Sequence, residues 1–245
     1  MIEFKNVSYS YACGRPVLHD ISLRIEDGEQ VGLIGANGAG KSTLLKAAVG
    51  LISAQGVITV NGMSVSADNL PEIRKTIGYV LQNSDNQMFM PTVLEDMTFG
   101  PMNYGMSRSE AEALADETLA GLGLSHLKNR HNHRMSGGEK RMAAIATALA
   151  MRPGTLIMDE PSSSLDPRNR RGLINTLNSL GQTKIIATHD LDMVLETCDR
   201  VILLSDGAIA ADGKAGDVLR DRELLEKNGL ELPFCLAGVP ERTRG

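Results

Sequence analysis

A glycine-rich segment close to the N-terminus has the residue types and spacing of a phosphate-binding loop. Residues 35–43 read Gly-Ala-Asn-Gly-Ala-Gly-Lys-Ser-Thr, which fits the pattern Gly-x-x-x-x-Gly-Lys-Ser at every fixed position. Glycines let the backbone curl so that its N–H groups face phosphate oxygens. Lys41 brings a positive charge to the β and γ phosphates, and the Ser42 hydroxyl can ligate Mg²⁺. The candidate nucleotide-binding residues here are Gly35, Asn37, Gly38, Gly40, Lys41, Ser42 and Thr43.

Two carboxylates at the end of an apolar run are a second candidate. Leu156-Ile157-Met158 is followed by Asp159 and Glu160, which matches a Walker B strand. Next to a phosphate-binding loop, Asp159 would hold Mg²⁺ through water and Glu160 would polarise the attacking water. An isolated pair of this kind is as often a solvated turn or a helix cap, so the interpretation depends on the loop.

The segment Met135-Ser136-Gly137-Gly138-Glu139 predicts the start of a helix that can bind an anion. Ser136 and Glu139 have the spacing of a capping box. The helix is indicated by apolar residues at i, i+3, i+4 and i+7, which are Met142, Ile145, Ala146 and Leu149. Gly137 and Gly138 leave the backbone bare in the first turn, where the helix dipole favours negative charge. Without the other two motifs, these residues would indicate an ordinary capped helix.

A strand and a helix flank the phosphate-binding loop, as such a site requires. The strand is Gln30–Ile34, and the apolar helix continues through Leu44, Leu45 and Val49. Further short strands are expected at Ile2–Val7, Ile21–Ile25 and Gly56–Val60, with turns at Asp27-Gly28 and Asn61-Gly62. The first 62 residues are therefore predicted to be rich in β-structure.

Residues from about 84 to 151 change in character and predict a mostly helical insert. A capping box at Ser107 and Glu110 begins a stretch rich in Ala, Glu and Leu that ends near 121–123. From Leu156 onwards, apolar strands alternate with a helix that follows Asp166-Pro167. The strands are expected at 156–158, 184–188 and 201–204. This alternation predicts a mostly parallel α/β sheet.

Two further segments carry no assigned chemistry. Beyond Gly213 we expect one short charged helix, Asp217–Lys227, and then a frayed tail from Leu230 to Gly245 with a basic end at 242–244. His131-Asn132-His133 lies in a polar loop and is expected to face solvent rather than to hold a metal ion, because no third ligand follows at a regular spacing.

The composition limits the class of protein. The chain has 245 residues, of which 42% are hydrophobic and 22% charged, so a compact domain is expected and a disulfide-stapled miniprotein is excluded. The net charge of −5 does not favour nucleic acid as a partner. Three cysteines without a CxxC pair, Cys13, Cys198 and Cys235, favour a reducing compartment. No apolar run reaches the roughly 18 residues of a membrane span, and the N-terminus lacks the pattern of a signal peptide.

Together, the three motifs and their order resemble the ATP-binding-cassette family of ATPases over residues 1 to about 215. The resemblance implies an α/β fold that has a P-loop NTPase core with a mostly parallel sheet. An N-terminal antiparallel β subdomain and an α-helical insert at about 84–151 complete this ATPase domain. A C-terminal helix and tail, 216–245, would follow it. The resemblance also implies ATP and Mg²⁺ as cofactors and ATP hydrolysis as the activity.

The resemblance implies roles for four further residues. Gln82, after the strand Ile77–Leu81, would lie near Mg²⁺ and the attacking water, and His189 would donate a hydrogen bond to the γ phosphate. Asp166 belongs to the D-loop, and Tyr11 would lie against adenine, although Tyr9 and Phe4 are also near. The implied catalytic residues are Glu160, His189 and Gln82; the Mg²⁺ ligands are Ser42, Gln82 and Asp159; ATP would also contact Tyr11, Ser136, Gly137, Gly138 and Asp166.

In this family two copies close head to tail around ATP. Phosphates bound by Lys41 of one copy would meet residues 136–138 of the other, so a second cassette, identical or a paralogue, is an expected partner. The sequence departs from the family pattern at Met135, where Leu is usual, and at Glu139, where Gln is usual. The capping role of Glu139 can direct its carboxylate back along the chain, so we expect activity to be retained.

A narrower resemblance follows Gln82. Residues 82–89, 91–96 and 99–103 read QNSDNQMF, PTVLED and FGPMN, which are similar to the ATPases of energy-coupling-factor importers and most similar to the cobalt and nickel branch. This implies a peripheral protein at the cytoplasmic face of the cell membrane, with integral membrane subunits that dock near Gln82–Met90. The row Met88, Phe89 and Met90 fits such docking, because three consecutive large apolar side chains cannot all face one core.

Alternatives to a metal importer differ in what they require. A vitamin importer of the same group and a soluble cassette ATPase that acts as a scaffold both remain open. A DNA-repair relative would need a long coiled coil between the phosphate loop and the signature, and a translation relative would need two cassettes. A GTPase would need an Asn-Lys-x-Asp motif, which the sequence lacks.

Overall fold

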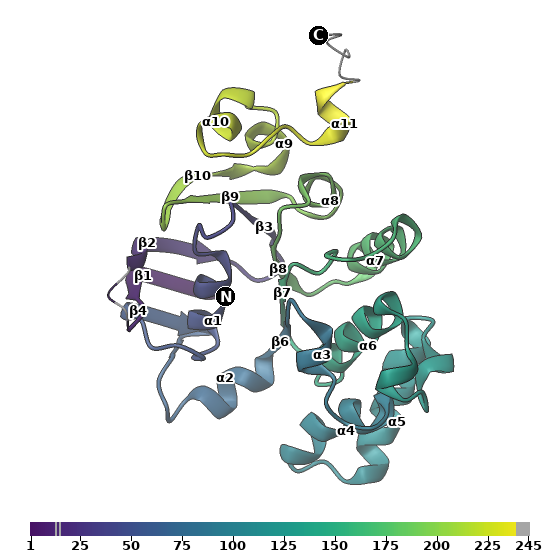
Figure 1. Ribbon diagram of the computed structural model, residues 1–245. Helices are drawn as coiled ribbons and strands as arrows, with labels where there is room; N and C mark the ends of the chain where they lie inside the picture. Colours follow the sequence, from purple (N-terminus) through teal and green to yellow (C-terminus); the bar gives the residue numbers. More distant parts are fainter. Residues whose placement is uncertain (13, 15, 239–245) are drawn as a thin grey trace.

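Two β-sheets enclose one helix and form much of the core. The structure, a computed structural model, describes residues 1–12, 14 and 16–238. An antiparallel sheet has the order β2-β1-β4-β5, and a second sheet has the order β10-β9-β3-β8-β7-β6, with α1 (Lys41–Ala48) between them (Figure 1). The strands are β1 (Ile2–Ser10), β2 (Pro16–Ile25), β3 (Gln30–Ile34), β4 (Gln55–Val60), β5 (Met63–Ser64), β6 (Ile77–Val80), β7 (Thr155–Asp159), β8 (Thr183–Ala187), β9 (Arg200–Ser205) and β10 (Ala208–Lys214).

The second sheet determines where the functional loops meet. Strands β3 and β6–β9 are parallel, and only β10 among its six strands pairs antiparallel. Along β7, Ile157 faces the core around α1, whereas Leu156 and Met158 face the core on the other side of the sheet. Burial on both faces explains the continuous apolar runs in the sequence. Because carboxyl ends of parallel strands meet at one edge, the loops after β3, β6, β7 and β8 are neighbours.

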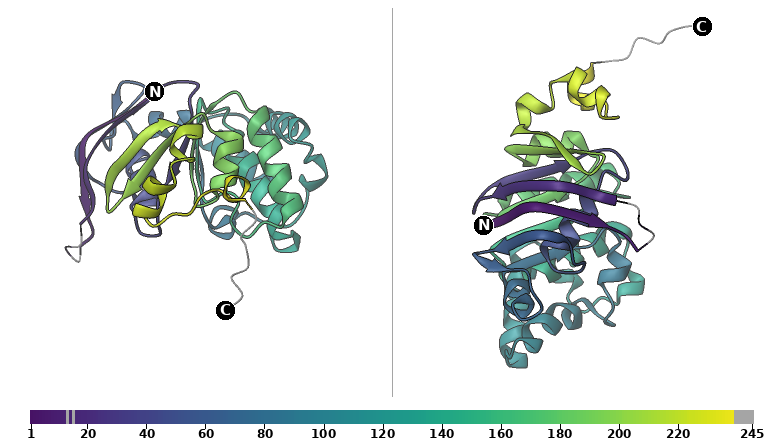
Figure 2. Two further views of the ribbon diagram at one scale, coloured as in Figure 1. Left: turned by 90° about the horizontal axis from the view of Figure 1, so that it is seen from above. Right: turned by 90° about the vertical axis from the view of Figure 1, so that its left-hand side faces the viewer.

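A helical lobe with its own apolar core follows β6. Capping boxes at Thr92, Ser107 and Ser136 begin its three longer helices. Figure 2 shows this lobe and the C-terminal helices at opposite ends of the molecule. The helices up to β9 are α2 (Leu70–Thr76), α3 (Ser84–Gln87), α4 (Val93–Asn103), α5 (Arg108–Gly121), α6 (Gly137–Leu149), α7 (Pro167–Ser179) and α8 (Leu191–Thr197), with short 3₁₀ turns at Ser125–Leu127 and Asn132–Arg134. The two sheets and the helical lobe confirm the predicted fold class.

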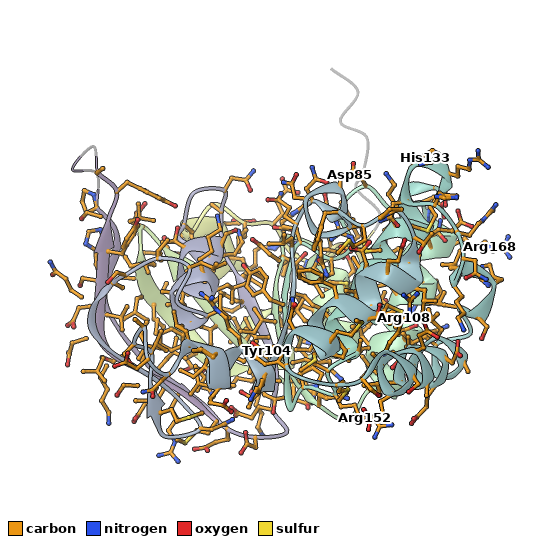
Figure 3. All side chains as sticks on the ribbon, turned by 90° about the horizontal axis from the view of Figure 1, so that it is seen from below. Asp85, Tyr104, Arg108, His133, Arg152 and Arg168 are labelled. Atoms are coloured by element: carbon orange, nitrogen blue, oxygen red, sulfur yellow. The ribbon has the colours of Figure 1, made fainter. Side chains whose placement is uncertain are left out.

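Tyr104 joins the helical lobe to the rest of the protein. It follows α4 and lies near the junction of the two halves of the molecule in Figure 3. Its hydroxyl donates to the Pro71 carbonyl at 3.2 Å, and the Lys75 ammonium lies 5.1 Å from the centre of its ring. A polar and a cation–π contact therefore connect α4 to α2.

The C-terminal part differs from the expectation. Residues 217–227 form two helices, α9 (Ala215–Val218) and α10 (Arg222–Lys227), because the Asp221 side chain caps a new helix by accepting from the Leu224 N–H. The predicted frayed tail is also wrong for its described part. Leu230 and Leu232 pack against a core, and α11 (Phe234–Ala237) follows. Cys13 and the basic end at 242–244 lie outside the described residues.

Like β5, α2 and α8, strand β10 is an element that the sequence analysis did not predict. Its Ala, Asp and Gly residues have low strand propensity, and tertiary pairing with β9 overrides that preference. Within the described part of the chain, no helix has both the length and the apolar character that crossing a bilayer requires.

Candidate active site

One cavity of about 620 Å³ collects most of the predicted nucleotide-binding residues. It lies where the loops after β3, β6 and β7 meet and where β2 passes over α1. The predicted residues that line it are Tyr11, Asn37, Gly38, Gly40, Lys41, Ser42, Thr43, Gln82 and Glu160. The topology thus brings segments that are far apart in the sequence to one polar cavity.

The phosphate-binding loop has a backbone that glycine alone adopts without strain. Gly40, with φ of 105°, precedes α1, and a side chain there would approach the Val17 carbonyl to 3.0 Å. The Lys41 ammonium is buried and donates to the carbonyls of Gly35 at 2.7 Å and Ala36 at 3.3 Å. Burial lowers the pKa of Lys41, against the opposing effect of two nearby carboxylates. A buried cation held by carbonyls fits the phosphates of ATP.

Ser42 and Asp159 form the pair that fits Mg²⁺. The Ser42 hydroxyl donates to Asp159 Oδ1 at 3.0 Å, and the carboxyl is almost fully buried. Burial raises the pKa of Asp159, while the hydrogen bond from Ser42 opposes the increase. A buried carboxyl beside a hydroxyl is a suitable donor set for this hard cation, and the exposed Gln82 lines the same cavity. The residues present therefore fit the predicted metal.

Glu160 is held in a strained and well-defined position. Its φ is 49°, which is uncommon for a residue other than glycine, and its N–H donates to the Ala187 carbonyl at 2.8 Å. One carboxylate oxygen, Oε2, accepts from the Thr188 hydroxyl at 3.1 Å and from the His189 N–H at 3.4 Å. Nδ1 of His189 lies 2.8 Å from the same oxygen. Neighbouring strands β7 and β8 thus bring the predicted base and the predicted histidine into contact.

His189 lies beside the nucleotide cavity rather than in its wall. Its side chain is 65% exposed and borders a second cleft together with residues of α7, α8 and the C-terminal segment. When Nδ1–H donates to Glu160, Nε2 of a neutral ring can only accept. A hydrogen bond from Nε2 to a phosphate therefore requires the doubly protonated ring or a change of partner.

The predicted signature and D-loop residues are not brought to this cavity. Ser136 and Gly137 are exposed at the start of α6, and a side chain at Gly138 would collide with Asn169. Asp166 is also exposed and caps α7 by accepting from the Asn169 N–H at 2.9 Å. The predicted capping box at Ser136 is confirmed, and Glu139 points back to the Ser136 N–H at 2.8 Å.

The family assignment follows from comparison with known proteins. The family model described as ABC transporter matches residues 18–163, which include the phosphate-binding loop and the carboxylate pair. The chain belongs to the ABC transporter family. It is an ATPase of this family, in agreement with the resemblance of its motifs.

Relatives and solved structures match this ABC ATPase over nearly its whole length. An ABC transporter ATP-binding protein of Geobacter sulfurreducens is 44% identical over 98% of this chain and 97% of its own. An energy-coupling factor transporter ATP-binding protein of Methanothermobacter thermautotrophicus is 43% identical over 95% of this chain and 77% of its own. The structure of cbiO1 from Clostridium perfringens, part of the ABC transporter complex cbiONQ, is 34% identical, with a TM-score of 0.81 over 92% of this chain and 93% of that one. A dimeric cassette bound to ADP and Pi is 29% identical, with a TM-score of 0.80 over 88% and 99%.

Tyr11 lines the nucleotide cavity. It is 43% exposed at the cavity, its ring meets that of Tyr9 edge to face at 5.1 Å, and its hydroxyl lies 3.3 Å from the Thr43 hydroxyl. It is therefore not a core residue. Its contact with adenine stays a prediction.

Sequence reasoning missed the part of the ABC ATPase cavity formed by β2 and the β9–β10 turn. Val17, His19 and Gly207 line the cavity, and the His19 N–H donates to the Gly207 carbonyl at 2.8 Å. Gly207 has φ of 76°, and a side chain there would come within 2.3 Å of the Val17 carbonyl. No motif marks these residues, because their contact depends on pairing between distant segments.

Proposed function

We propose that this ABC ATPase is the ATP-hydrolysing subunit of an energy-coupling-factor importer that drives uptake of cobalt or nickel ions through membrane subunits. The proposal rests mainly on the segment after β6, because this segment connects the nucleotide cavity to an exposed apolar side chain. It begins with Gln82 in the cavity and reaches Phe89, which is 62% exposed. Relatives named as energy-coupling factor ATPases and the cbiO1 structure support it.

Residues of this chain bind ATP and activate water in the proposed reaction. Backbone N–H groups of residues 35–43 and the Lys41 ammonium bind the phosphates, and Tyr11 contacts adenine. Ser42, Asp159 and Gln82 would hold Mg²⁺, which would supply positive charge to the phosphate oxygens. Glu160 accepts the proton of the attacking water. The contacts of Thr188 and His189 with Oε2 orient its carboxylate, which leaves Oε1 for that water.

A second cassette completes the site in this proposal. Ser136 and Gly137 are exposed at the start of α6, directly before the buried Gly138, and N–H groups and the helix dipole favour an anion there. The dimeric cassette bound to ADP and Pi supports pairing of two cassettes. In the proposed head-to-tail pair, residues 136–138 meet phosphates bound by the partner. The D-loop residue Asp166 belongs to the same surface.

The apolar surface near Phe89 is the proposed docking site for a membrane subunit. Met88 is buried, whereas the Phe89 ring projects outwards and meets Phe99 of α4 edge to face at 5.1 Å. The prediction that at least one side chain of 88–90 faces outwards is thus confirmed. Other exposed apolar residues of this lobe are Met102, Tyr104 and Met106.

Buried polar contacts connect this docking segment to both halves of the site. The Asp96 carboxylate accepts from the Phe89 and Met90 N–H groups at 3.2 and 3.1 Å and from the Asn132 amide at 2.6 Å, just before the signature. The buried Arg141 guanidinium of α6 donates to the carbonyls of Leu81 at 2.7 Å and Gln82 at 2.5 Å. In this proposal these contacts carry movement at Phe89 to the signature helix and to the cavity.

Co-purification and ion uptake test this function. The chain is expressed with the open reading frames next to its gene, membranes are purified, and uptake of cobalt and nickel ions into vesicles is measured with internal ATP. ATP-dependent uptake that disappears in the Glu160→Gln variant is the expected result. Vitamin uptake without metal uptake would assign the other importer branch. A chain that never co-purifies with an integral membrane subunit would favour a soluble scaffold.

A further inference from the structure

The segment of residues 229–235 lies against the beginning of α8, next to the loop that carries His189. Both border one cleft of about 950 Å³, whose walls include His189, Asp192 and Phe234. Leu230 and Leu232 hold the segment there by packing against the core to which α8 contributes, and Pro233 is buried. In Figure 1, α9–α11 cover the β9–β10 end of the sheet and α11 is on the side of α8. A part of the chain outside the nucleotide cavity therefore reaches the loop between β8 and α8.

Asp192 fixes this segment by two backbone hydrogen bonds. Its Oδ2 accepts from the Phe234 N–H at 3.0 Å, and its Oδ1 accepts from the Cys235 N–H at 2.9 Å. Burial alone would raise the pKa of Asp192, but the hydrogen bonds from residues 234 and 235 outweigh it and hold this pKa below its ordinary value. Hydrogen bonds to an ionised carboxylate are stronger than neutral ones, so each contact restrains both segments.

The other side of the same helix turn is fixed by α7. Asp190 caps α8 by accepting from the Met193 N–H at 3.0 Å, and it forms a two-point ion pair with Arg170, in which both N···O distances are 2.6 Å. The first turn of α8 thus lies between a contact to α7 and a contact to the C-terminal segment. His189 lies directly before this turn, and Asp192 follows it by three residues.

We propose that the C-terminal segment, through its two N–H contacts to Asp192, positions His189 for ATP hydrolysis. The proposal rests on the role of His189 given under the proposed function. Asp192 is a positioning residue, because it contacts the segment and not the nucleotide cavity. The α8 helix has only seven residues, so a shift of its first turn changes the place of His189 relative to Glu160. Displacements of about 1 Å at a reacting group cost on the order of 10²-fold in rate.

A proline substitution removes one contact with little other change. Phe234 is the first residue of α11, where proline is tolerated, and Pro233 before it has the extended ψ of 139° that a following proline favours. Phe234→Pro therefore deletes the N–H that binds Asp192. The matched control is Phe234→Ala, which keeps the N–H and removes a ring that is 85% exposed.

The expected result is a fall of about ten- to a hundredfold in kcat for Phe234→Pro relative to Phe234→Ala, as the loss of one charge-assisted hydrogen bond would give. Binding of ATP, measured with a fluorescent analogue, should stay within about twofold, since the phosphate loop is untouched. In a His189→Ala background the same Phe234→Pro change should have no further effect on kcat. If the Phe234 N–H contact had only a structural role, Phe234→Pro would lower kcat by the same factor with His189 and with Ala at position 189. That outcome would overturn the proposal. Equal kcat for the two Phe234 variants would also overturn it.

A second variant covers the case in which Phe234→Pro does not fold. Asp192→Asn replaces one acceptor oxygen by an amide that faces the two N–H donors, so at least one contact is lost. Its control is Glu196→Gln, the same chemical change on α8 at a carboxylate that pairs with Arg171. Only Asp192→Asn should lower kcat, and equal effects of both would refute the positioning role. If His189→Ala alone leaves kcat unchanged, the role of His189 given under the proposed function fails. That outcome is distinct from equal kcat values for the two Phe234 variants, which would refute only the positioning role of the C-terminal segment.

Discussion

The Glu160→Gln substitution tests whether this carboxylate activates the attacking water. Glutamine keeps the size of the side chain and one carbonyl oxygen, which can still accept from the Thr188 hydroxyl and the His189 N–H, now at 3.1 and 3.4 Å. The backbone N–H of residue 160 still donates to the Ala187 carbonyl, so the strained φ is retained. The change removes the negative charge and the capacity to take a proton.

The expected loss in turnover is that of a general base, about 10²–10⁴-fold, which corresponds to roughly 2.7–5.5 kcal/mol of activation free energy. ATP binding should persist, because Lys41, Ser42 and Asp159 are unchanged. Phosphate release measures turnover, and a fluorescent ATP analogue measures binding. The control is Glu117→Gln, which removes a carboxylate that is 70% exposed in an ion pair with Arg152 on the helical lobe. Turnover of Glu160→Gln within about threefold of the unmodified chain, with binding intact, would refute the assignment and make His189 the next candidate.

Further predictions address assembly, coupling and pH. Ser136→Arg and Lys41→Ala proteins should each be inactive, whereas their mixture should regain part of the activity because a mixed pair has one intact composite site. Head-to-tail assembly would be contradicted by a mixture without activity. It would also be contradicted if the rate of the unmodified chain is linear in protein concentration down to a monomer. Phe89→Ser should abolish import while the melting temperature and the ATPase rate of the isolated chain stay unchanged, and unchanged import would exclude docking at this residue. Burial alone would raise the pKa of Asp190, but its hydrogen bonds with Arg170 and the Met193 N–H outweigh burial, so this pKa lies below its ordinary value. The ionised Asp190 therefore contributes fully to the free energy of unfolding above about pH 4, the pKa of an unfolded Asp. This contribution is lost as the pH falls through the lower pKa of the folded state. Asp190→Asn should flatten the acid side of a stability–pH curve measured by urea unfolding.

The sequence predicts the centre of the site because the chemistry there is local. The phosphate loop is a continuous segment whose glycines, Lys41 and Ser42 act together. Glu160 and His189 follow the ends of β7 and β8, which pair in parallel, so the strand pattern alone brings them to one edge. The contact of His189 Nδ1 with Glu160 is a detail of side-chain geometry that the strand pattern does not contain.

The parts that could not be predicted depend on contacts between distant segments. Residues 229–238 contain short apolar stretches separated by Pro and Gly, which predict a frayed end when read alone. Their position depends on Leu230 and Leu232, which pack against a core built by other elements, and on Asp192, which precedes its partner Phe234 by 42 positions. Val17 and Gly207 are similar, because their contact needs β2 to lie beside the β9–β10 turn.

The same topology explains why the predicted signature and D-loop residues lie away from the cavity. Lys41 lies after β3, which is an inner strand of the six-stranded sheet. Ser136 caps α6, which belongs to the helical lobe inserted between β6 and β7. Within one chain Gly138 is buried against Asn169 of α7, whereas Ser136 and Gly137 before it are exposed to solvent. Ser136 and Gly137 leave an exposed helix start that favours an anion, and in the proposed head-to-tail pair this anion is the phosphate of ATP bound by the other cassette. In this proposal the second copy is part of the active site itself, so the rate of hydrolysis should depend on the square of the chain concentration where the chain is mostly monomeric.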